Sequence, residues 1–162
     1  MRSQLLTEGP PRMWAVIFAT DDDFLSELGQ WVESSGLRAA SLTGIGGFRR
    51  AVLGYYDLDA RSYVDIPVDD QVEVLALAGD VTCNDDSHQI HTHVVCGRRD
   101  GSTVGGHVQQ AVVRPTLEVV VTESPTFLQR RHDGESGLAL IDLERITSGP
   151  EPAHLGGSIR PE

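Results

Sequence analysis

The sequence predicts an α+β fold, in which a mixed, mainly antiparallel β-sheet follows one principal N-terminal helix. Two observations predict it. Residues 20–36 have the periodicity and end signals of a helix, and about seven or eight later segments have the apolar alternation of strands. The chain has 162 residues, a length that suits one domain burying most of its apolar surface.

A buried strand and the helix come first. The run MWAVIFA is almost wholly apolar, as expected of a buried strand. Directly after it, Thr20 or Asp21 can cap a helix, and Phe24 and Leu28 recur on one helical face. Gly36 is placed to end this helix.

The rest of the ordered chain is predicted to be strands joined by turns. The segments are LRAASLTGIGGFRRAVLGYYDL, divided in two by a glycine bend or bulge, then SYVDIPV, VEVLALAGDVT, IHTHVVCG, STVGGHV, LEVVVTE and GLALIDLE. The turn RRDG is expected to join IHTHVVCG to STVGGHV as a hairpin. We expect residues 1–11 and the Gly- and Pro-rich tail 147–162 to be disordered, which places the domain at 12–146.

The composition excludes several classes of function. The formal charge is −11, and all thirteen cationic side chains are arginine, so lysine Schiff-base chemistry and a P-loop are absent from this chain. An acidic body repels duplex DNA unless its arginines gather on one face. Cys83 and Cys96 lack CxxC spacing and are expected to be buried thiols. With no membrane-length apolar run and no secretory signal, the expected compartment is the cytoplasm.

Four of the six histidines fall between residues 88 and 107. On a strand, His91 and His93 project from the same face, ~7 Å apart at Cα. The predicted hairpin brings His107 back towards them, and Gly105 and Gly106 remove side chains that would crowd the approach. Three neutral imidazoles with an open fourth position form the ligand set of a catalytic zinc site, or of a related divalent metal.

Strand parity sets the other histidines apart. Cys96 and His88 fall on the face opposite His91, and His132 and His154 lie in polar segments where solvation is expected. The alternative for the pair His91 and His93 is a solvated strand face, or burial with ordinary hydrogen-bond partners.

Two further residues are candidates for catalysis. Arg49 follows the glycine-rich stretch GIGG, and a guanidinium beside exposed backbone amides can bind a carboxylate or phosphate. Glu118 interrupts the apolar run TLEVVVT, and a carboxylate near a metal can act as a general base or as a further ligand. The alternatives are a surface cation for Arg49 and an outward-facing or ion-paired strand residue for Glu118.

Five motifs, in this order along the chain, resemble the plants-and-prokaryotes-conserved (PPC) domain family. They are GIGGFRRAVLGYYD (44–57), EVLALAGDV (73–81), IHTHVV (90–95), DGSTVGGH (100–107) and RPTLEVVVTE (114–123). The resemblance runs from about Arg12 to Arg145. It implies an α/β fold with a mixed, mainly antiparallel sheet and a homotrimer.

The resemblance also implies a metal. In some bacterial members of the family, histidines bind one near the subunit interface, and their pattern falls here on His91, His93 and His107. Acetolactate decarboxylase, a metal enzyme with three histidines, shares the fold. Plant relatives attach an AT-hook that binds DNA, and bacterial relatives are often labelled candidate DNA-binding proteins. This chain has no Arg-Gly-Arg-Pro hook.

Three interpretations stay open at this point. The first is a metal-binding protein, with zinc as the expected ion, that acts as a hydrolase or lyase. The second is a DNA-associated regulatory protein, which the family label favours and the net charge opposes. The third is a scaffold trimer that binds a small anionic metabolite without turnover. None of the three involves a membrane.

Overall fold

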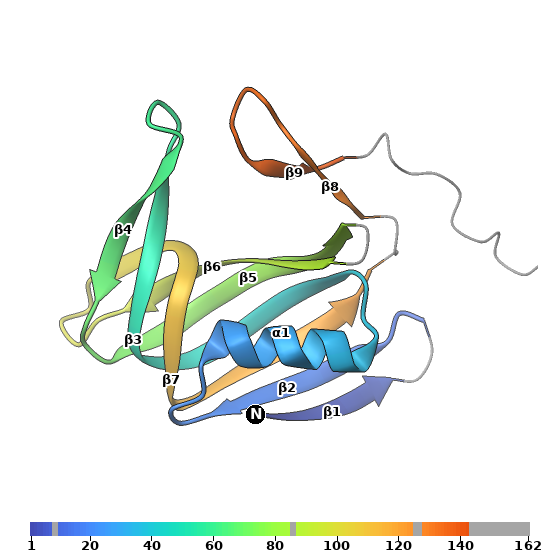
Figure 1. Ribbon diagram of the computed structural model, residues 1–162. Coiled ribbons are helices and arrows are strands. Elements are labelled where there is room, and N and C mark those ends of the chain that lie inside the picture. Colours follow the sequence, from blue (N-terminus) through green and yellow to red (C-terminus); the bar gives the residue numbers. More distant parts are fainter. Residues whose placement is uncertain (8–9, 85–86, 125–127, 143–162) are drawn as a thin grey trace, which may run out of the picture.

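One large β-sheet with a helix packed on it forms the body of the molecule (Figure 1). The computed structural model describes residues 1–7, 10–84, 87–124 and 128–142. The pairings between its strands are antiparallel, which confirms the predicted α+β fold. The elements are β1 (Arg2–Thr7), β2 (Met13–Ala19), α1 (Phe24–Ser35), β3 (Ala40–Asp57), β4 (Ser62–Val68), β5 (Val72–Asn84), β6 (Ser87–Gly97), β7 (Thr103–Glu123), β8 (Arg130–His132) and β9 (Ala139–Ile141).

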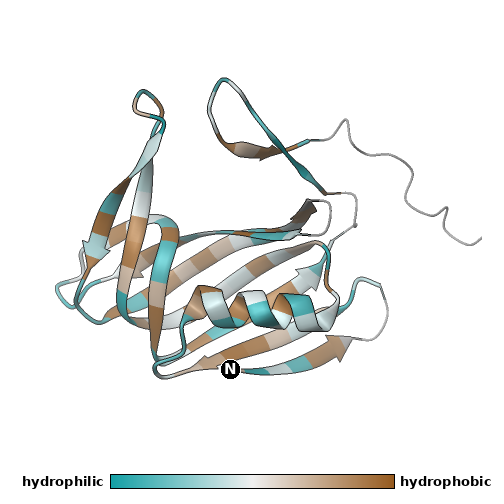
Figure 2. Cartoon of the chain, viewed as in Figure 1, coloured by the Kyte–Doolittle hydropathy of each residue, from teal (hydrophilic) through white to brown (hydrophobic). Residues whose placement is uncertain are grey.

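Two long strands, β3 and β7, hold the sheet together. The strand order is β1-β2-β7-β6-β5-β3-β4, and β3 and β7 also pair with each other along most of their lengths. The first half of β3 borders β5 and its second half borders β4, while β7 borders β6 and then β2. The sheet therefore curls back on itself, and apolar residues recur along its strands (Figure 2).

Each long strand was expected to be two strands, and the structure corrects this. Register shifts between Gly44 and Phe48 bend β3 without ending its pairing with β7. Gly46 adopts φ +153, and a Cβ there would lie 2.3 Å from the carbonyl oxygen of Thr116. Pro115 falls inside the same shift, where the ladder requires no donor from it, so β7 continues through it.

Helix α1 covers one face of the sheet and closes the core. Its N-cap is Asp23, which accepts a hydrogen bond of 3.0 Å from the backbone N–H of Ser26, so the expected caps Thr20 and Asp21 lie outside the helix. Gly36 ends the helix in the left-handed region, as predicted. The aromatic rings of Phe18 and Phe24 pack edge-on in this core. The largest fully buried side chains are Phe18, Phe24, Phe48, Leu28, Leu37, Leu42, Leu53 and Leu117.

The first strand lies in a segment that was expected to be disordered. Residues Arg2–Thr7 pair with β2, and the terminal amine of Met1 forms an ion pair of 2.7 Å with Asp22. Leu5 packs against the core, so apolar burial and a strand ladder order this segment. The expected tail, 147–162, lies outside the described residues.

The predicted hairpin between β6 and β7 is present. At its turn, the backbone N–H of Arg98 donates to the carbonyl of Ser102 at 2.8 Å. The ladder that follows places His93 directly opposite His107. A Cβ at Gly105 would lie 2.8 Å from the carbonyl oxygen of Val94, and one at Gly106 would lie 2.9 Å from that of Gly54. Both glycines therefore let three strands approach closely beside the histidines.

A bulge in β5 changes which of its residues face outward. The register shifts between Val74 and Ala76, so that Leu77 is buried while Ala78 is exposed. Strict alternation along VEVLALAGDVT would instead place Ala78 on the buried face with Val72 and Val74, and Leu77 on the exposed face. As a result, Asp80 lies directly across the ladder from His91.

Substituting Gly106 by Ala is expected to destabilise the protein by about 1–3 kcal/mol, because the new Cβ would press on backbone atoms of β3. Gly134→Ala is the matched control, since a Cβ there meets no heavy atom within 4 Å, and it is expected to change stability little. Urea unfolding of the two variants measures the difference. Equal stabilities would show that the strands separate easily at Gly106.

Candidate metal centre

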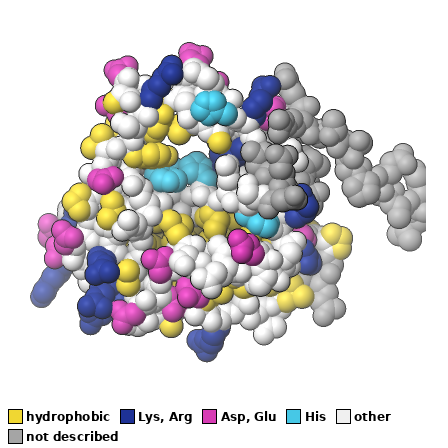
Figure 3. All heavy atoms as spheres, viewed as in Figure 1, with side chains coloured by type: hydrophobic (Ala, Val, Ile, Leu, Met, Phe, Trp, Pro, Cys, Tyr) yellow, Lys and Arg dark blue, Asp and Glu magenta, His cyan; other side chains and the backbone are white. Residues whose placement is uncertain are grey.

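Three histidine side chains converge on one face of the β6–β7 hairpin. The ring centroids of His91 and His93 are 4.9 Å apart, and His107 lies 5.2 Å and 5.3 Å from them. One nitrogen of each ring can be chosen so that all three lie within 4.8 Å of one another. Figure 3 shows histidines in a hollow beneath the projecting β3–β4 arm and the β8–β9 hairpin.

The geometry of this cluster suits a metal ion. The Nε2 atoms of His91 and His93 are 3.1 Å apart. Zinc–nitrogen bonds of about 2.0–2.1 Å at tetrahedral angles would place two ligand nitrogens about 3.3 Å apart. A hydrogen bond between the two imidazoles is the alternative for this pair. It leaves His107 unexplained, because its Nδ1 is buried without a hydrogen-bond partner among the described residues.

Burial keeps two of these imidazoles neutral. Burial, with repulsion from charged forms of His91 and His93 adding to it, lowers the pKa of His107 to about 4. Burial, again with a contribution from His91, also lowers the pKa of His93. Since a metal binds the neutral imidazole, the site presents ligands that are deprotonated at neutral pH.

A buried guanidinium and a carboxylate stand behind His91. Arg130 is 7% exposed, and its Nη2 donates to both oxygens of Asp80 at 2.7 and 2.8 Å. The same side chain donates to Thr82 Oγ1 at 3.1 Å and to the carbonyl of Ala139 at 2.9 Å. Burial raises the pKa of Asp80, but its interactions with His91 and Arg130 outweigh this and hold the pKa below its ordinary value.

This pair determines which nitrogen of His91 is available. Nδ1 lies 3.2 Å from Arg130 Nη2 and 3.7 Å from Asp80 Oδ2. If Nε2 binds a metal, Nδ1 carries the proton, and only the carboxylate can accept it because a guanidinium has no acceptor. In this structure Nδ1 instead accepts from Arg130 Nη2, and 3.7 Å to Asp80 is longer than a hydrogen bond. Binding of a metal at Nε2 therefore requires a small shift that brings Nδ1–H onto Asp80, which would form the carboxylate–histidine pair that commonly orients a metal ligand.

The opposite side of the cluster is aromatic. The ring of Tyr63, on β4, stacks on His107 with centroids 4.9 Å apart, and Tyr56 packs edge-on against Tyr63. This stacking fixes the plane of the His107 ring and shields it from water.

Strand alternation and the hairpin predicted the meeting of the three histidines but not the residues that support them. Asp80 was hidden by the bulge in β5, although a carboxylate inside the apolar run LALAGDV was a usable signal. Arg130 and Tyr63 had no pattern in the sequence that linked them to the histidines. Both come from strands at the edges of the described sheets.

The two candidate catalytic residues lie away from the three-histidine cluster. Arg49 is exposed and forms an ion pair of 2.7 Å with Asp21. Glu118 is exposed on β7, paired with Ile17 of β2 and Ile45 of β3, whereas the histidines lie at the β6 side of the sheet. The structure thus supports the surface alternatives for their positions, and their catalytic roles stay predictions.

The remaining histidines and Cys96 are arranged largely as strand parity predicts. Cys96 is buried on the core face, where burial raises its pKa to about 11. His88 lies at the start of β6 and is half-buried. His132 is exposed, as expected, and lies at the end of the short strand β8. His154 lies outside the described residues.

The chain belongs to the PPC family. A family model described as the Plants and Prokaryotes Conserved (PCC) domain matches residues 6–125. This match covers strands β2 to β7, the helix and all three histidines, and it confirms the resemblance recognised in the sequence. The β8–β9 hairpin lies beyond it.

Solved structures of similar proteins share the fold. A metal-containing protein from Archaeoglobus fulgidus is 30% identical, with a TM-score of 0.74, over 86% of this chain and 96% of that protein. A PPC protein from Pyrococcus horikoshii is 25% identical, with a TM-score of 0.75, over 81% and 91%. A candidate DNA-binding protein from Bacteroides thetaiotaomicron is 22% identical, with a TM-score of 0.80, over 88% and 98%.

One more distant structural match is to a protein related to an enzyme. A Staphylococcus aureus protein described as similar to alpha-acetolactate decarboxylase is 15% identical, with a TM-score of 0.51, over 68% of this chain and 51% of that protein. This shows a related fold alone. No curated protein matches the chain. Among the described residues, no helix has the length and apolar character needed to cross a membrane.

The pKa of His107 predicts how the metal-free protein responds to acid. The folded pKa of about 4 lies below the unfolded value of about 6.5, so between these values the unfolded chain binds the extra proton. The free energy of unfolding should therefore fall as pH is lowered from about 6.5 to about 4. The fall due to this group is about 3 kcal/mol at most. Urea unfolding across this pH range, in the presence of a chelator, measures it.

Two variants isolate this effect from the protein's other titrating groups. His107→Gln should flatten the pH dependence, whereas His132→Gln, at an exposed position, should leave it unchanged. Parallel curves for the two variants would show that His107 titrates normally in the folded protein.

Proposed function

We propose that this protein is a metal-binding member of the PPC family that holds a divalent cation, with zinc the expected ion, on His91, His93 and His107. The observation that carries the proposal is the convergence of His91, His93 and His107, which each offer one imidazole nitrogen within 4.8 Å of the others. The metal-containing relative from Archaeoglobus fulgidus, 30% identical, supports it.

The donor set determines what such a site can do. Three neutral imidazoles leave the ion's positive charge uncompensated and at least one coordination position open, so a small anion or a carbonyl oxygen can bind there. When bound, a divalent ion supplies Lewis acidity to that oxygen. Around it, Asp80 and Arg130 orient His91, and Tyr63 restricts the access of water to His107. We propose binding of a small anionic ligand here, with hydrolase or lyase chemistry as the activity to test.

Removal of one ligand tests the metal site directly. His93→Ala should lower zinc affinity by more than about 100-fold, because losing only a hydrogen-bond partner of a ligand typically costs about 10- to 100-fold. Elemental analysis after dialysis against a zinc buffer measures bound metal per chain. His88→Ala, on the same strand but outside the cluster, is the matched control and should retain its zinc. Equal zinc contents in the two variants would overturn the proposal.

A second part of the proposal concerns assembly. The sheet face opposite α1 carries an open apolar hollow of about 650 Å³, lined by Ile17, Ile45, Leu75, Ala78 and Val120 among others. Ile45 is 60% exposed and Leu75 is 54% exposed. Apolar surface gathered in this way is typical of a protein–protein interface. We propose that this face associates with further copies of the chain in a homotrimer, as the family resemblance implies.

A charge placed on this face should disrupt the assembly. Leu75→Arg should raise the concentration at which the oligomer dissociates by about tenfold or more, since burying a leucine is worth about 1.5–3 kcal/mol. Sedimentation velocity over a concentration series measures it. Leu58→Arg changes another exposed leucine, at the β3–β4 turn, and should leave assembly intact. A native chain that sediments as a monomer would refute this part.

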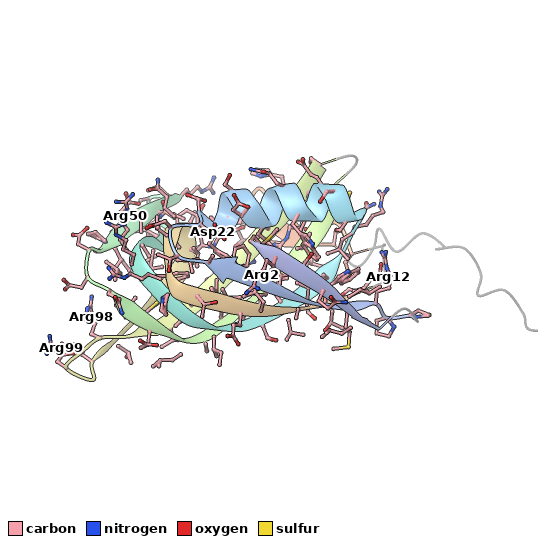
Figure 4. All side chains as sticks on the ribbon, turned by 90° about the horizontal axis from the view of Figure 1, so that it is seen from below. Arg2, Arg12, Asp22, Arg50, Arg98 and Arg99 are labelled. Atoms are coloured by element: carbon pink, nitrogen blue, oxygen red, sulfur yellow. The ribbon has the colours of Figure 1, made fainter. Side chains whose placement is uncertain are left out.

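The DNA-associated alternative rests on the description of relatives such as the Bacteroides protein. The surface of this chain opposes it, since the formal charge is −11. Figure 4 places Arg98 and Arg99 at one end of the molecule and Arg12 near the other, so these arginines are spread apart and do not form one basic cluster. The side chain of Arg12 is also paired with Glu123. The metal-binding proposal is therefore the better supported of the two.

A further inference from the structure

We propose that the β8–β9 hairpin, together with Tyr63 and Ile90, forms a pocket beside the metal centre that takes the short apolar chain of a small carboxylate whose carboxylate group binds the metal. This inference rests on the proposed metal site and adds the class of ligand. It also assigns a role to a segment that lies beyond the residues matched by the family.

The pocket is a cavity of about 270 Å³ that abuts the histidine cluster. Its walls include Tyr63, Ile90, His91, Arg130, Leu138 and Leu140. Two of these residues belong to the metal centre's surroundings, because His91 is a ligand and Tyr63 stacks on His107. A ligand in this cavity therefore lies against His91, the one cluster histidine that lines it, and against Tyr63.

The outer wall of the pocket is firmly attached to the rest of the protein. Arg130 is buried at the base of the hairpin and bonds to Asp80 and Thr82 on β5 and to the carbonyl of Ala139 on β9. At the other end of the hairpin, the hydroxyl of Tyr56 donates to the carbonyl of Ser136 at 2.8 Å. Contacts at both ends hold the hairpin in place, so the pocket is preformed.

The charge distribution indicates which end of a ligand lies where. Arg130 is the cationic side chain among the cavity-lining residues, and Asp80 accepts two of its hydrogen bonds and neutralises it. A ligand anion therefore finds its counter-charge at the metal and not at the guanidinium. The cavity's exposed lining is mainly apolar, which suits a hydrocarbon chain.

The volume limits the size of that chain. Pockets for drug-sized ligands span about 300–1,000 Å³, so a cavity of about 270 Å³ lies at or below the small end. A short aliphatic or small branched carboxylate is of a size to occupy this volume.

Cobalt-loaded protein allows metal uptake and ligand binding to be measured separately. The visible absorption of Co²⁺ reports its coordination, and titration with acetate, propionate and butyrate gives a dissociation constant for each. Each methylene that enters the cavity should tighten binding by up to about fourfold, so butyrate should bind up to about 15-fold more tightly than acetate.

A bulky residue in the cavity should abolish this preference. Leu138→Trp fills the pocket and should make butyrate bind no more tightly than acetate. Ile141→Trp makes a comparable change on β9 at a residue that does not line this cavity, and should keep the native preference. The Co²⁺ spectrum of each variant without carboxylate shows whether its metal site is folded.

The outcomes distinguish the two proposals. Native protein that binds Co²⁺ and all three carboxylates equally overturns the pocket and leaves the metal site standing. A chain-length preference that survives Leu138→Trp also overturns the pocket. Failure of the native protein to bind Co²⁺ through its histidines overturns the metal proposal and this inference with it.

Discussion

The pairing of β6 with β7 is the constraint on which the candidate site depends. It places His93 directly opposite His107, and the two-residue period of a strand then brings His91 to the same face. A slip of one residue would turn the histidines of one strand to the opposite face. The tight turn between Arg98 and Ser102 fixes this register, and the glycines before His107 allow the strands to close on it.

This arrangement has an energetic cost that a metal would remove. A buried polar atom without a partner, such as His107 Nδ1, costs about 1–3 kcal/mol. Burial also disfavours the charged form of the ring, which is why its pKa is low. The first term destabilises the folded protein at neutral pH, whereas the second does so only below about pH 6.5, where the unfolded chain takes up the proton. The low pKa also keeps the ring in the neutral form that a cation binds. The environment of His107 is therefore costly in the metal-free protein and favourable for a metal ligand.

The part of the site that could be predicted from the sequence is the part set by local rules. Alternation along a strand, a turn with an Asp-Gly tip and two glycines were enough to bring three histidines together. Asp80 could not be placed in this way, because the bulge before Ala76 reverses the alternation in β5 and results from pairing with distant strands. The continuation of β7 through Pro115 has the same origin, since only the register shift against β3 makes that position tolerable.

The β8–β9 hairpin joins the metal centre through Arg130, although it lies outside the family match. Asp80 contacts Arg130 on one side and approaches His91 on the other, so the position of the hairpin bears on the orientation of a metal ligand. The two equilibria are coupled reciprocally. If docking of the hairpin strengthens metal binding by a given free energy, metal binding strengthens docking of the hairpin by the same free energy. A segment added to the common fold can in this way tune both the ion and the pocket beside it, without any change to the three histidines.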